Sequence, residues 1–221
     1  MKTTTRGFFL VVEGADGSGK STLVRHLAEV YGSRGWNICL VREPGGTPFS
    51  ERVRRMLLDK ASQMHARSEL FLYLAARAQV VDDVIRPALA RGAMVIADRF
   101  SLSTYAYQSG GRGLPLFAVA GADQFARDGL SPDLTLVLSV SVQEAARRRR
   151  RAGRPSDRME AESPRFHEAV HQFYDRWGSR HLGYRLINSE APLRQVQARA
   201  VALVDARLRR LAMTTRRRLR A

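Results

Sequence analysis

The stretch GADGSGKS, residues 14–21, constrains the fold of this chain more than any other segment. It matches the pattern G-x-x-x-x-G-K-[S/T] at every fixed position. Glycines are required because the backbone must curl tightly to point its N–H groups at phosphate oxygens, and a following helix N-terminus adds partial positive charge. An apolar run over 7–13 precedes the motif, and an amphipathic helical pattern over 21–34 follows it. We therefore predict a strand, a phosphate-binding loop and a helix, in that order.

This loop predicts a nucleoside triphosphate site. Lys20 should contact the β- and γ-phosphates, and the hydroxyl of Ser21 should help to hold Mg²⁺. The motif alone does not distinguish a kinase from a GTPase or an ATP-driven machine. The residues predicted to bind ATP are Gly14, Ala15, Asp16, Gly17, Ser18, Gly19, Lys20, Ser21 and Thr22.

Four further short apolar runs indicate strands buried on both faces of a parallel sheet. They cover residues 37–43, 93–98, 134–140 and 184–188. Helical patterns alternate with them over 50–59, 66–91, 116–128, 142–151, 164–181 and 192–210, and Pro87 is expected to kink the second. This alternation predicts an α/β fold, a five-stranded parallel sheet flanked by helices with right-handed crossovers. We expect a single domain over residues 1–206 and a basic C-terminal tail over 207–221.

The amino-acid composition indicates which class of partner the protein binds and in which cellular compartment it lies. Lys and Arg number 37 against 21 Asp and Glu, and the formal charge of +16 favours a polyanion partner: nucleic acid, nucleotides or acidic lipid. The single cysteine, Cys39, cannot form an internal disulfide, which agrees with a reducing compartment. The N-terminal apolar run is too short for a membrane span, so we expect a cytoplasmic protein with no membrane partner.

Charged residues at the ends of two predicted strands suggest a second anion site. Asp98 ends an apolar run and Arg99 follows at once, a carboxylate for metal beside a guanidinium for phosphate. An ordinary strand-end aspartate in a turn is the alternative. Glu43 and Pro44 follow another strand, at the carboxyl edge where open α/β sheets bind ligands, and Arg54 beyond them is a further candidate phosphate ligand.

Six segments carry a resemblance to a known family: GADGSGKST, REPGGTPFSE, ELFLYLAARAQ, ADRFSLSTYAYQSGGRG, PDLTLVL and DRMEAES. In content, order and spacing the chain is similar to bacterial thymidylate kinases from about Phe8 to about Val196. The resemblance implies a P-loop kinase fold with a lid segment, and Mg²⁺- and ATP-dependent phosphorylation of dTMP to dTDP for dTTP synthesis. It also implies a cytoplasmic homodimer whose small-molecule partners are ATP and dTMP.

The same resemblance implies a set of dTMP-binding residues: Glu43, Pro44, Arg54, Phe71, Arg77, Arg99, Thr104, Tyr107 and Gln108. Phe71 would stack on the thymine ring, although the helical pattern alone favours core packing for it. Arg77 would hydrogen-bond the base, with Thr104 and Gln108 at its polar edge. Tyr107 would pack against the deoxyribose and disfavour a 2′-hydroxyl. The monophosphate would lie on Arg99 and Arg54, beside Glu43 and Pro44.

The arginine-rich run over 147–154 has three competing interpretations: a solvated helix face, a nucleic-acid arm, and a lid over the triphosphate. The phosphate loop carries an acid, Asp16, where some thymidylate kinases carry a catalytic arginine. The resemblance therefore implies that arginines of a lid, at about 147–162, supply this charge. The candidates are Arg150, Arg154 and Arg158, while the first arginines of the run, starting at Arg147, would complement the C-terminal dipole of the preceding helix.

The predicted catalytic residues are Lys20, Arg99, Arg150, Arg154 and Asp16, and the predicted metal ligands are Ser21, Asp98 and Asp16. Either Glu160 or Glu162 would touch the substrate side on closure. Ser139 and Asn188 stand where the family often has aspartate, and Ser101 where many relatives carry a polar or acidic residue. With the charge of +16, Ser139 motivates the alternative function: a nucleic-acid-associated or catalytically weakened P-loop protein. A kinase for another nucleoside monophosphate is a further alternative.

Overall fold

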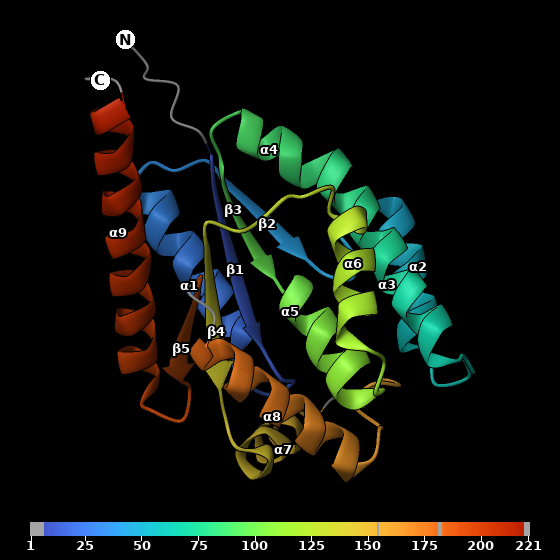
Figure 1. The fold of residues 1–221 in the computed structure, drawn as a ribbon. Coiled ribbons are helices and arrows are strands. Elements are labelled where there is room, and N and C mark those ends of the chain that lie inside the picture. The colour runs from blue at the N-terminus through green and yellow to red at the C-terminus, as the bar shows by residue number, and fades with distance from the viewer. Residues whose placement is uncertain (1–6, 154, 181–182, 219–221) are drawn as a thin grey trace.

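The computed structural model of the protein describes residues 7–153, 155–180 and 183–218. A five-stranded parallel sheet forms its centre, with the strand order β2-β3-β1-β4-β5 (Figure 1). The strands are β1 (Phe8–Gly14), β2 (Ile38–Arg42), β3 (Met94–Asp98), β4 (Leu134–Ser139) and β5 (Tyr184–Asn188). The predicted α/β fold with a five-stranded parallel sheet is confirmed, and every strand end lies within one residue of its predicted position.

Alternate side chains of β1 divide the core between the two faces of the sheet. Leu10 and Val12 face one side and pack with α1 (Lys20–Ser33) and α9 (Leu193–Arg218). Phe9 and Val11 face the other side, where α3 (Ala66–Val80) and α4 (Arg86–Ala90) supply the cover. Because both faces are covered, β1 is apolar along most of its length and every one of its residues is buried.

The predicted helix over 66–91 differs from the structure in its middle. It contains α3, a π-helical turn η1 (Val81–Ile85), and α4. The N–H of Arg86 donates to the carbonyl of Val81, five residues back, and Pro87 lies in the first turn of α4. Since Pro87 has no N–H to offer, the widened turn before it accommodates the proline without ending the helix.

Two further segments differ from the sequence prediction. The short helix α5 (Ser101–Thr104) and the π-helical segment η2 (Tyr105–Gly111) form where no element was predicted. The predicted basic tail from residue 207 is wrong in its conformation, because α9 continues to Arg218. Leu208 and Leu211 pack against the core, and Arg207 Nε donates to the carbonyl of Asp133 at 2.8 Å. None of the helices in the described ranges has the length and apolar character needed to cross a membrane.

The remaining helices are α2 (Pro48–Leu58), α6 (Leu116–Ala126), α7 (Val142–Arg151) and α8 (Pro164–Arg180). Figure 1 shows α7 and α8 at the edge of the sheet toward which the strand arrows point. All five strands are parallel, so their carboxyl ends meet at this edge. The phosphate loop after β1, the turn after β3 and the loop after β2 therefore lie close together.

Candidate active site

The loop after β1 has the backbone conformation that its glycines predict. Gly14, Gly17 and Gly19 have φ of 143°, 88° and 95°, which side-chain-bearing residues rarely adopt. A Cβ on Gly17 would lie 2.5 Å from the carbonyl oxygen of Ala145, because α7 packs directly on the loop. Gly19 caps α1, so the N–H groups of the first helical turn have no partner within the helix and suit an anion.

Lys20 and Ser21 begin α1 inside this loop. Lys20 Nζ donates to the carbonyl of Ala15 at 3.0 Å, and burial together with the nearby charge of Arg99 lowers its pKa to about 8. Ser21 Oγ donates to Asp98 Oδ2 at 2.8 Å, which places a hydroxyl and a carboxylate of two different elements side by side. Ser18 Oγ is buried and has no hydrogen-bond partner among the described residues, a polar atom that a phosphate could satisfy.

The Ser21–Asp98 pair suits Mg²⁺. Magnesium is commonly bound through one or two carboxylates and a hydroxyl, while substrate phosphates and water supply its other ligands. Within the described ranges no three His, Cys, Asp or Glu side chains converge as a metal-binding group. The oxygen ligands present therefore fit an ion that depends on bound phosphates for the rest of its coordination.

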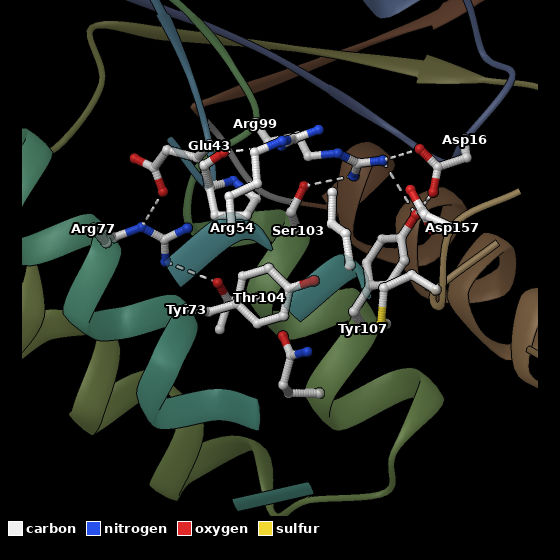
Figure 2. A pocket seen from close by; sticks show the side chains of 14 residues that line it. Asp16, Glu43, Arg54, Tyr73, Arg77, Arg99, Ser103, Thr104, Tyr107 and Asp157 are labelled. Atoms are coloured by element: carbon white, nitrogen blue, oxygen red, sulfur yellow. Dashed lines mark hydrogen bonds and ion pairs between the residues drawn. The ribbon is translucent and has the colours of Figure 1, made fainter. Parts of the chain in front are cut away.

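A second pocket opens beside the phosphate loop, with about 550 Å³ of space including its mouth (Figure 2). Eight of the nine residues predicted to bind dTMP line it: Glu43, Pro44, Arg54, Arg77, Arg99, Thr104, Tyr107 and Gln108. The exception is Phe71. The other lining residues are Asp16, Leu58, Tyr73, Ser103, Asp157 and Met159.

Arg99 is held in a strained turn at the head of this pocket. Its φ of 79° lies in the left-handed region, a conformation that costs a non-glycine residue about 1–3 kcal/mol. The turn is anchored by Glu13, a buried carboxylate that accepts from the N–H of Phe100 at 2.8 Å. The guanidinium donates to Ser103 Oγ at 2.9 Å and to Asp16 Oδ1 at 2.5 Å. The backbone distortion therefore turns a charged side chain toward the phosphate loop.

Asp16 binds the pocket arginine. Tyr107 donates its hydroxyl to Asp16 Oδ2 at 2.7 Å, so Tyr107 and Arg99 engage both carboxylate oxygens. Burial alone would raise the pKa of Asp16, but Arg99 and then Lys20 lower it well below its usual value. Arg99 and Lys20 thus supply the positive charge that offsets the buried carboxylate of Asp16. Its proposed role as a metal ligand stays a prediction, because these contacts orient it toward the second pocket.

Arg77 lies at the base of the pocket between two acids. Its Nε donates to Glu43 Oε2 at 2.7 Å, and its Nη1 donates to Asp123 Oδ1 at 2.6 Å and to Thr104 Oγ1 at 2.8 Å. Burial raises the pKa of Glu43 to about 7 although Arg77 opposes the shift. Asp123 was not predicted. The signal was present in the sequence, since it is an acid within the otherwise apolar helix LFAVAGADQFA.

The structure does not place Phe71, which was predicted to stack on the base, at this pocket. Its side chain is 64% exposed and does not line the pocket. Tyr73 lines the pocket instead, and Figure 2 labels it among the lining side chains. The physical reason is helical geometry. Tyr73 precedes Arg77 by four positions and shares its face of α3, whereas Phe71 precedes it by six and lies about 240° away.

Among the described arginines of the 147–154 run, Arg149 donates a hydrogen bond to the phosphate loop. Its Nη1 donates to the carbonyl of Asp16 at 2.8 Å. Arg147 and Arg148 pair with Glu144 on the same helix, as a helix-completing role predicts. Arg150 lines a neighbouring surface hollow that also contains Arg149. Sequence reasoning missed Arg149 because spacing within five consecutive arginines does not show which one faces the loop.

Two other lid candidates have different outcomes. Arg154 lies outside the described residues. Arg158 contacts α2 and α3: its Nε donates to the carbonyl of Leu57 at 2.7 Å and its Nη2 lies 2.7 Å from Glu69 Oε2. These contacts with α2 and α3 do not bring Arg158 to the triphosphate site, and its action on the triphosphate stays a prediction. Glu162 pairs with Arg112 at 2.6 Å.

The unusual strand-end residues have local explanations. Ser139 Oγ donates to Asp175 Oδ1 at 2.6 Å, so a carboxylate from α8 lies at the end of β4 although residue 139 is a serine. Asn188 Oδ1 accepts from the N–H of Glu190 at 2.9 Å and closes the turn after β5. The serine at 139 and the asparagine at 188 therefore do not remove the contacts that the phosphate loop makes.

Together, the sheet topology, the phosphate loop and an arginine-lined pocket beside it define a P-loop kinase with room for two phosphorylated ligands. The sequence pattern of the thymidylate kinase family matches residues 12–200. The chain belongs to the thymidylate kinase family.

Named relatives agree with this assignment. A thymidylate kinase of Pseudomonas fluorescens (strain SBW25) is 47% identical over 206 residues, covering 92% of this chain and 98% of the relative. A thymidylate kinase of Ectopseudomonas mendocina (strain ymp) is 46% identical over 204 residues, covering 91% and 97%. One of Pseudomonas putida (strain GB-1) is 46% identical over 200 residues, covering 90% and 95%.

Proposed function

We propose that the protein transfers the γ-phosphoryl group of ATP to the phosphate of dTMP, giving dTDP, as a single P-loop domain in the cytoplasm. The observation that carries this proposal is the junction of the two sites at Asp98 and Arg99. Asp98 contacts Ser21 at the start of α1, and Arg99 contacts Asp16 at the mouth of the second pocket. Two consecutive residues thus serve the donor side and the acceptor side.

On the donor side, the loop N–H groups and Lys20 would bind the phosphates of ATP. Ser21 and Asp98 would hold Mg²⁺, which supplies charge neutralisation across the β- and γ-phosphates. A bound triphosphate would replace the carbonyl of Ala15 as the partner of Lys20 Nζ, now 3.0 Å away. Because burial depresses the pKa of Lys20 to about 8, the incoming negative charge would also favour its protonated form.

On the acceptor side, Arg99 and Arg54 would bind the monophosphate. Arg54 Nη1 already donates to the carbonyl of Pro44 at 2.9 Å, which holds the guanidinium at the pocket wall. Tyr73 would stack on the thymine ring, and Arg77 would donate to the base from the floor of the pocket. The attacking phosphate oxygen is anionic at neutral pH, so the reaction needs alignment and charge stabilisation and no strong general base.

Arginine at the rim of the phosphate loop would stabilise the transferring group. Arg149 reaches the backbone of Asp16, between the two proposed phosphate sites. In related P-loop systems an added arginine is worth about 10³–10⁵ in rate. Positive charge from α7 would thereby take the place of an arginine within the loop itself.

We also propose that the protein acts as a homodimer through the outer faces of α3 and α6. These two helices pack against each other, and three of their large aromatic residues are exposed. Phe71, Phe117 and Phe125 are 64%, 82% and 89% exposed. Exposed aromatic side chains on packed helices suit burial against a second copy of the same surface. Sedimentation equilibrium should give a dimer for the wild type and a smaller species for Phe117→Glu with Phe125→Glu.

A coupled assay of ADP release tests the proposed function. The protein is offered ATP and Mg²⁺ with dTMP, dUMP, dCMP, dGMP or AMP in parallel, and dTMP is expected to give the highest kcat/KM. Lys20→Met serves as the control for phosphoryl transfer, because it removes the loop cation while keeping a long side chain. No turnover of dTMP, or a clear preference for another monophosphate, would contradict the proposal.

A further inference from the structure

One carboxylate outside the predicted site contacts both the pocket wall and the segment over 157–162. Glu69, in the first turn of α3, is 1% exposed. Its Oε1 accepts from Gln108 Nε2 at 3.0 Å, and Gln108 is itself 1% exposed and lines the second pocket. Neither the sequence motifs nor the mechanism above gives Glu69 a role.

Arginines fix the position and charge of Glu69. Arg112 donates Nε to Oε1 at 3.0 Å and Nη2 to Oε2 at 2.9 Å, a two-pronged pairing that sets the plane of the carboxylate. Arg158 Nη2 lies 2.7 Å from Oε2. Burial alone would raise the pKa of Glu69, but the hydrogen bonds from Arg112, Arg158 and Gln108 lower it below its ordinary value. The carboxylate is thus ionised and immobile.

An ionised carboxylate accepts hydrogen bonds and donates none. The amide of Gln108 must therefore turn its NH₂ end to Glu69, and its carbonyl oxygen becomes the end available to the pocket. Without Glu69, either orientation of the amide would be open, because its two ends have nearly the same shape.

We propose that Glu69 is a positioning residue for base selection: it holds the Gln108 carbonyl toward the base, so that the pocket accepts an imide ring and rejects a cytosine ring. This inference rests on the proposed function and names a device that sets its specificity. Arg77 offers donors from the same pocket, so the pair presents a donor beside an acceptor. Thymine offers the complementary pair, a carbonyl oxygen beside a ring N–H. Cytosine offers an amino group and a bare ring nitrogen, and both contacts would be repulsive.

The test compares the dissociation constants of dTMP and dCMP by calorimetry and the kcat for dTMP in wild type and Glu69→Gln. An amide at position 69 can accept or donate, so Gln108 is released to turn over. We expect the preference for dTMP over dCMP to fall by about tenfold or more, since a hydrogen bond to a charged group is lost, with kcat within about threefold. The matched control is Glu168→Gln: Glu168 accepts from a glutamine amide at 3.4 Å on the exposed side of α8.

One further variant keeps the inference falsifiable if Glu69→Gln folds poorly, as judged by circular dichroism, and a double variant tests the coupling if it folds. Arg112→Gln keeps the Glu69 charge but removes its two-pronged anchor, and should lower the preference at least about threefold. In a Gln108→Leu background, Glu69→Gln should change the preference no further. If the preference for dTMP over dCMP is unchanged in folded Glu69→Gln or in Arg112→Gln, the inference about Glu69 is overturned and the proposed function is not affected. Absence of dTMP turnover by the wild type overturns the proposed function and this inference with it.

Discussion

Replacing Tyr73 by alanine tests which aromatic side chain of α3 carries the base. Tyr73 lines the pocket and is packed against Val53 and Leu57, whereas Phe71 is 64% exposed on another face of the same helix. Stacking of one base on an aromatic ring is worth about 1–3 kcal/mol by alanine substitution. Since about 1.4 kcal/mol is tenfold in affinity, the dissociation constant for dTMP should rise about 5- to 150-fold in Tyr73→Ala.

The measurement is calorimetric titration with dTMP, because a KM equals a dissociation constant only when chemistry is slow. Tyr73→Phe keeps the ring and should bind dTMP within about threefold of wild type. Phe71→Ala is the matched control, and its dTMP affinity should stay within about twofold. The reasoning fails if Phe71→Ala weakens dTMP binding as much as Tyr73→Ala, or if Tyr73→Ala leaves binding unchanged.

Four other outcomes follow from the geometry. Arg149→Ala should lower kcat about 10³–10⁵-fold with little change in dTMP affinity, whereas the exposed Arg151→Ala should not, in steady-state kinetics. Asp98→Asn should raise the Mg²⁺ concentration needed for half-maximal rate, measured by Mg²⁺ titration at fixed ATP; an unchanged requirement would exclude Asp98 as a ligand. The free energy of unfolding should fall as pH rises from 4.5 to about 7, because folded Glu43 retains a proton that the unfolded chain has released; denaturant melts of Glu43→Gln should lack this contribution. DNA binding should be absent in fluorescence anisotropy. Strongly salt-dependent binding that Arg209→Glu on α9 weakens would instead support a nucleic-acid partner.

The phosphate loop could be predicted from sequence because its requirements are local. Gly14, Gly17 and Gly19 each have a positive φ that few other residues tolerate, and Lys20 follows at a fixed offset. The strands could be predicted for a related reason. Burial on both faces leaves a continuous apolar run, such as FFLVV in β1, that no other common element of that length explains.

The parts that sequence did not reveal depend on tertiary contacts. The two aromatic residues of α3 differ by two positions, and only the direction of Arg77 shows which of them faces the pocket. Asp123 reaches Arg77 from 46 residues away along the chain, and Glu69 reaches Gln108 from 39. Hydrophobic periodicity also gave no reason to extend the last predicted helix past residue 210. Arginines make the segment there look polar, although Leu211 packs against the core.

The order of residues at the end of β3 has a consequence for the alignment of the two substrates. Asp98 and Arg99 are neighbours in the chain, so their Cα atoms are separated by one trans peptide unit, about 3.8 Å. This covalent link fixes the interval between the two Cα atoms, while the side-chain rotamers of Asp98 and Arg99 set where the carboxylate and the guanidinium lie. A shift of the end of β3 would therefore move the donor-side and the acceptor-side residue together.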